Sequence, residues 1–165
     1  QTEAMLRIQS GAGGGNLATH IGASLSDGVV ERLLAASKSI SPDLGSKVRE
    51  LLDLEVGWDG EDAKPVGLEV LTRTVMLLRR VKQAHSDFVL PFIAPTFEGS
   101  VLLDWTSPQR SLEVQARPSG WSATGTLTTA DGRKQYFSGQ WDLTGFGAFK
   151  YYDWFRDELL IWPTE

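Results

Sequence analysis

The chain contains no cysteine and only two histidines among its 165 residues. The lack of cysteine excludes a disulfide framework, a thiolate nucleophile and a cysteine-based metal site, and it suits a reducing compartment such as the cytoplasm. His20 and His85 lie too far apart in sequence to form a metal motif of local spacing. We therefore expect each histidine to have a structural role and predict no metal and no cofactor.

Long apolar runs and an excess of positive charge are also missing. The longest apolar stretches, such as residues 75–78 and 88–94, are far shorter than the roughly 20 residues that span a bilayer, which predicts no transmembrane helix. The first residues show neither the basic nor the apolar region of a signal peptide.

Sixteen basic against twenty-one acidic residues give a net charge of -5, which disfavours nucleic acid as a direct partner. The densest cationic stretch, which is Arg73, Arg79, Arg80 and Lys82, falls at the end of a predicted helix, where cations stabilise the helix dipole.

The hydrophobic content of 41% is ordinary for a folded domain, and its periodicity is helical in the first half of the chain. Apolar spacing and capping residues predict helices over 26–39, 42–54 and 65–84, the last with Pro65 in its first turn. The glycine-rich stretch 11–16 lacks the lysine and hydroxyl of a phosphate loop, so it is interpreted as a linker. We expect residues 1–25 to be a flexible or loosely ordered segment and 26–165 to be one domain.

After residue 87 the period changes from helical to alternating. The pattern predicts an edge strand at 92–94, strands at 101–105, 112–117, 121–129 and 133–141, and a last helix that begins after Gly147. Asp131-Gly132 is a strong hairpin signal. The predicted fold class is therefore α+β: N-terminal helices, an antiparallel meander of four or five strands with one buried face, and a C-terminal helix.

The loop between the second and third helices is the most distinctive segment. It combines Trp58 with the carboxylates Asp59, Glu61 and Asp62. The spacing of these carboxylates does not follow the pattern of a calcium-binding EF-hand loop. One interpretation is an acidic turn ahead of a helix, in which Trp58 only pins the loop to the fold. The other is a docking point, because an aromatic ring among carboxylates suits a basic protein surface. Trp162, near the end of the chain, is a second candidate anchor.

Four segments together resemble a loose group of short bacterial proteins: the stretch from Gly57 to Pro65, the following helix, Ile93-Ala94-Pro95, and the strand from Gly99 to Trp105. These proteins carry a Gly-Trp-Asp-Gly loop with a downstream proline, followed by an apolar strand that ends in tryptophan. The resemblance covers residues 51–116 and implies a small accessory or regulatory protein near defence or mobile-element systems. It implies no catalytic residue.

The sequence shows no nucleophile elbow, no His-Glu-x-x-His element and no obvious pair of catalytic carboxylates. We therefore expect a non-enzymatic protein-interaction module, an accessory subunit of a bacterial defence or toxin-neutralising assembly, with Trp58, Asp59, Glu61, Asp62 and Trp162 as partner-binding residues. One alternative is an enzyme or small-ligand binder with a pocket between helices and sheet that uses His85 or a carboxylate. A structural homo-oligomeric subunit is the other.

Overall fold

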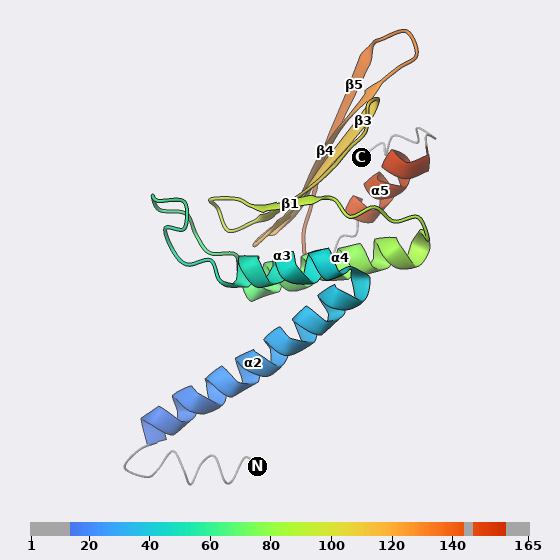
Figure 1. Ribbon diagram of the computed structural model, residues 1–165. Coiled ribbons are helices and arrows are strands. Elements are labelled where there is room, and N and C mark those ends of the chain that lie inside the picture. Colours follow the sequence, from blue (N-terminus) through green and yellow to red (C-terminus); the bar gives the residue numbers. More distant parts are fainter. Residues whose placement is uncertain (1–13, 144–146, 158–165) are drawn as a thin grey trace.

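The computed structural model describes residues 14–143 and 147–157, with side chains at 27–143 and 147–156. Within these ranges, three helices come first, a five-stranded antiparallel sheet follows, and a helix packs last, so the α+β prediction is confirmed (Figure 1). The helices are α2 (Gly14–Ile40), α3 (Pro42–Leu52), α4 (Leu68–Ala84) and α5 (Gly147–Asp157). None of the helices in the described ranges is long and apolar enough to cross a membrane.

The sheet is a simple meander in which each strand pairs with the next along the chain. Its order is β1 (Phe92–Pro95), β2 (Val101–Thr106), β3 (Arg110–Arg117), β4 (Gly120–Thr128) and β5 (Lys134–Trp141). The predicted edge position of the first strand is confirmed. Proline at its end has no N–H to donate, which an edge position tolerates.

One face of the sheet is buried beneath the helices, as the alternating pattern predicts. Val101, Leu103 and Trp105 on β2 are at most 3% exposed, and β3 contributes Leu112, Val114 and Ala116, all completely buried. Helix α4 packs its apolar stripe against this face and α5 covers part of β3 and β4 (Figure 1). Burial of this apolar surface is the main stabilising contribution to the fold.

The opposite face of the sheet stays open and is polar. Cross-strand register places Asp104 beside Glu113, and Glu113 beside Thr124. Ser111 and Thr126 join hydroxyls across β3 and β4 at 2.7 Å. The helices therefore cover a single face of the meander, which leaves the second face to solvent.

Two helix starts differ from the sequence-based prediction. The first helix begins at Gly14 rather than near Ser26, so described residues inside the expected loose segment 1–25 are helical. The third begins at Leu68, not at Pro65, because residues 63–66 run along the core with Ala63 and Val66 buried. Gly67 is the residue before the first turn of α4.

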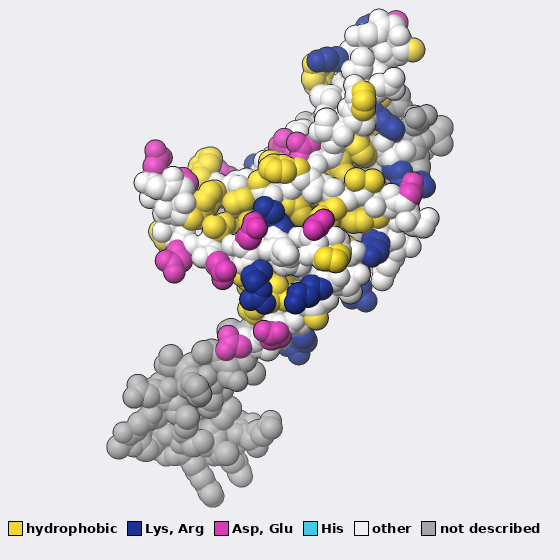
Figure 2. Space-filling view, viewed as in Figure 1, with side chains coloured by type: hydrophobic (Ala, Val, Ile, Leu, Met, Phe, Trp, Pro, Cys, Tyr) yellow, Lys and Arg dark blue, Asp and Glu magenta, His cyan; other side chains and the backbone are white. Residues whose placement is uncertain are grey.

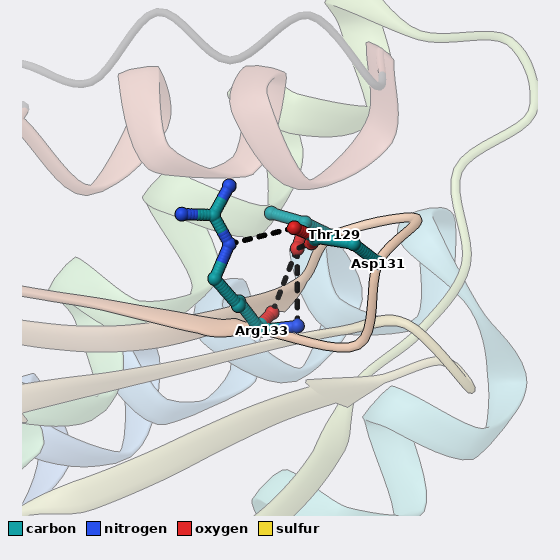
Figure 3. A network of polar contacts seen from close by, with 3 residues as sticks. All are labelled: Thr129, Asp131 and Arg133. Carbon is teal, nitrogen blue, oxygen red and sulfur yellow. Dashed lines mark hydrogen bonds and ion pairs between the residues drawn. The ribbon is translucent and has the colours of Figure 1, made fainter.

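The β4–β5 hairpin confirms the turn predicted from Asp131-Gly132. Gly132 adopts a φ of 83° and donates its N–H to the Thr129 carbonyl at 2.9 Å. The Asp131 carboxylate accepts from the Thr129 hydroxyl and from Arg133 Nε, the latter at 2.8 Å (Figure 3). These hydrogen bonds hold the pKa of Asp131 below its usual range, with the Thr129 hydroxyl as the largest cause.

Candidate functional site

The loop that connects α3 to α4 is internally hydrogen-bonded. Gly57 donates its N–H to the Ala63 carbonyl at 2.8 Å, and Gly60 donates to the Gly57 carbonyl at 2.9 Å. Both glycines have positive φ, 78° and 89°, a conformation that costs other residues free energy. We call residues 55–66 the acidic loop; the two glycines let it close on itself.

Trp58 holds this loop in place and is half-buried. Its indole Nε1 donates a hydrogen bond of 2.9 Å to the carbonyl of Lys64. The ring therefore spans the loop from its first turn to its last residues. Of the two interpretations of Trp58, pinning the loop has direct geometric support, and the partial exposure leaves one part of the ring open to contact.

Asp59 also has an internal role, whereas Glu61 and Asp62 point to solvent. The Asp59 Oδ1 accepts from the Glu61 N–H at 2.9 Å and from the Ala63 N–H at 3.2 Å. This is the Asx-type turn that aspartate favours. Glu61 and Asp62 are exposed. Within the described ranges, no three metal-ligating side chains gather in one place.

The acidic loop is tied to the turn between β1 and β2, a link that the sequence did not reveal. Lys64 donates its N–H to the Phe97 carbonyl at 2.9 Å. Gly99 has a φ of 84°, and a Cβ there would lie 3.0 Å from the Pro65 carbonyl oxygen. The close approach of Gly99 to Pro65 brings Phe97 and Glu98 beside the acidic loop.

The joined segments form one surface, which we call the acidic patch: Glu55, Val56, Trp58, Asp59, Glu61, Asp62, Phe97 and Glu98. Its apolar members are conspicuous, since Val56 is 77% and Phe97 65% exposed. All five carboxylate residues are exposed as well. Figure 2 shows hydrophobic side chains bordered by acidic ones over this loop and the neighbouring hairpin. Among the residues with described side chains, none of these carboxylates forms an ion pair.

Two of the four basic residues in the cationic stretch, Arg73 and Lys82, bind backbone carbonyls of neighbouring segments. The Arg73 guanidinium donates to the carbonyls of Arg117 and Gly120, the latter at 3.3 Å. Burial lowers the pKa of Arg73, an effect that the neighbouring carboxylate of Glu69 opposes. Lys82 Nζ donates to the Ile40 carbonyl at 2.6 Å and to that of Ser39 at 3.3 Å, at the end of α2.

His85 joins the end of α4 to α5. Its Nε2 lies 2.5 Å from Asp153 Oδ1, and only 11% of its side chain is exposed. The ring stacks near Phe149 and tilts against Tyr152, with centroid distances of 6.4 and 5.5 Å. Asp87 and Arg156 make a second link at 2.8 Å. Through these contacts His85 packs the end of α4 against α5.

Trp162, the second predicted anchor, lies outside the described residues. Comparison of the chain with family models, with curated proteins and with solved structures finds no match in any of the three. The resemblance to the Gly-Trp-Asp-Gly proteins therefore stays a prediction.

Proposed function

We propose that this protein is a non-enzymatic interaction module that captures a basic protein partner through the acidic patch, as an accessory subunit of a bacterial defence or toxin-neutralising assembly. One observation carries the proposal: exposed apolar side chains and five exposed carboxylate residues meet on two segments that are locked together. Apolar anchors supply burial, and acidic groups around them supply orientation and encounter rate.

The charges of the patch favour a partner of opposite sign. Its carboxylates repel one another, and the single nearby cation of the acidic loop, Lys64, offsets only one of them. A partner that brings lysine or arginine relieves this repulsion. Its capture should therefore weaken as salt concentration rises.

In this proposal Val56 and Phe97 make more of the apolar contact than Trp58. Trp58 gives its polar atom to the loop, while Val56 and Phe97 expose most of their apolar surface. Trp58 contributes its open ring edge and keeps the patch in shape. Trp162 remains a proposed second anchor.

The test compares two phenylalanines of equal exposure. Phe97 belongs to the patch and Phe92 lies at the opposite end of β1, and each is 65% exposed. In affinity purification with mass spectrometry, Phe97→Ser should lose the partner that the wild type enriches, and Phe92→Ser should keep it. Glu98→Lys should also lose it. Equal capture by all variants, or an enriched partner with an acidic surface, would contradict the proposal.

A second function, binding of a small polar ligand, is favoured by a hollow on the open face of the sheet. It has a volume of about 610 Å³, and Asp104, Glu113 and Tyr136 are among its lining residues. This hollow lies on the face away from the helices, not between helices and sheet as the sequence-based alternative expected. Thermal stabilisation by a metabolite, lost in Tyr136→Ala, would favour this function over the first.

A further inference from the structure

A groove of about 470 Å³ lies directly beside the acidic patch. Pro65 and Leu68 give it apolar walls together with Pro118, and Glu69 and Glu98 add one carboxylate each from α4 and from the β1–β2 turn. Glu98 belongs to both surfaces. The groove therefore continues the patch toward the start of α4.

The groove is held open by contacts from three sides. Lys64 donates its N–H to the Phe97 carbonyl at 2.9 Å, and Gly99 approaches Pro65 closely. On the third side, the Arg73 guanidinium binds carbonyls at both ends of the β3–β4 turn, which carries Pro118. A groove that needs no opening costs a ligand less conformational free energy.

We propose that this groove receives an aliphatic side chain, such as leucine, from an extended segment of the basic partner, with arginine or lysine on either side of it. The inference rests on the proposed function and names the chemistry of the segment that the partner presents. Apolar walls suit the aliphatic side chain. The flanking cations meet Glu69, Glu98 and the carboxylates of the patch, and Lys64 is the one basic side chain among the groove's lining residues.

Gly67 offers a way to obstruct the groove at only a modest cost in helix capping. It lines the groove, has φ -70° and ψ 150°, and a Cβ added there would meet nothing within 4 Å. Any L-residue adopts these angles. Because Gly67 lines the groove, Gly67→Leu should place a bulky side chain at its wall and reduce the room for a ligand. Gly28 on α2 is the matched control, since it is exposed and a Cβ there also meets nothing within 4 Å.

The experiment is an NMR titration with a capped peptide of sequence Arg-Gly-Arg-Leu-Arg-Gly-Arg. Amide shifts should concentrate at Gly67, Leu68 and Gly99, and affinity should fall roughly tenfold when alanine replaces the leucine of the peptide. Gly67→Leu should reduce affinity by a similar factor, whereas Gly28→Leu should not change it. Equal binding of the leucine and alanine peptides, shifts elsewhere, or no binding of the peptide would overturn the inference.

The same variants separate this inference from the proposed function. If Phe97→Ser loses the cellular partner while Gly67→Leu retains it, the groove does not take part and the patch still does. If neither variant loses the partner, both the inference and the proposed function fail. If both variants lose it and Gly28→Leu retains it, both stand.

Discussion

Replacing Trp58 with phenylalanine separates its role in the loop from its role at the surface. The substitution keeps an aromatic ring and removes the Nε1 donor, so the Lys64 carbonyl loses its 2.9 Å hydrogen bond. Such a bond contributes about 0.5–1.5 kcal/mol to the free energy of unfolding. For a chain of this length, that corresponds to a melting temperature lower by about 2–4 °C for each kcal/mol.

Two further variants calibrate the measurement. Trp58→Ala also removes the packing of a half-buried ring, so it should cost about 2 kcal/mol, below the range for a fully buried tryptophan. Phe97→Ser should change the free energy of unfolding by no more than about 0.5 kcal/mol, because that side chain is 65% exposed. Urea unfolding followed by circular dichroism measures all three.

A Trp58→Phe variant as stable as the wild type would contradict this expectation. That result would mean that the loop does not depend on the indole hydrogen bond, and the pinning role would be lost. A Phe97→Ser variant that unfolds more easily than Trp58→Phe would also contradict it, because Phe97 would then be part of the packing rather than of the contact surface.

Three more perturbations test the fold around the patch. Leu78→Ala in the core should cost about 2–5 kcal/mol in urea unfolding, since its side chain is completely buried; a loss below about 1 kcal/mol would contradict the packing. Gly99→Ala forces a side chain into positive φ beside the Pro65 carbonyl, so it should lower the free energy of unfolding by about 1–2 kcal/mol and shift the amide resonances of the acidic loop. Unchanged amide resonances would contradict the link between the acidic loop and the β1–β2 turn. Asp87, whose pKa is lowered chiefly by its hydrogen bond from Arg156, stabilises the fold above the unfolded pKa and loses that contribution as the pH falls below about 4. Asp87→Asn should therefore show a smaller loss of stability between neutral and acid pH than the wild type, and an identical acid profile would exclude the link.

The fold class could be read from the sequence because its signals are local. Strict alternation marked Val101, Leu103 and Trp105 as one face of a strand, and all three are buried. The hairpin at Asp131-Gly132 follows from backbone preferences of two neighbouring residues. The hydrophobic period and the turn preferences depend on a few neighbouring residues, so they can be recognised without knowledge of the rest of the chain.

The helix starts were missed where two local signals competed. Leu17, Ile21, Leu25, Val29 and Leu33 recur at a spacing of four, which is a helical pattern. The glycines at 13–15 obscured it because glycine is unfavourable in helices. Pro65 favoured a helix start, but burial of Val66 keeps that segment along the core.

The layers of this protein and its aromatic, acidic loop follow from the order of amino acids, because hydrophobic periodicity and composition are properties of neighbouring residues. The surroundings of the loop depend on contacts between distant segments. Phe97 and Glu98 lie more than thirty positions beyond Trp58, and the backbone hydrogen bond from Lys64 and the close approach of Gly99 to Pro65 bring the two segments together. The groove beside them combines α4 with the β1–β2 and β3–β4 turns, so it exists only once the chain has folded.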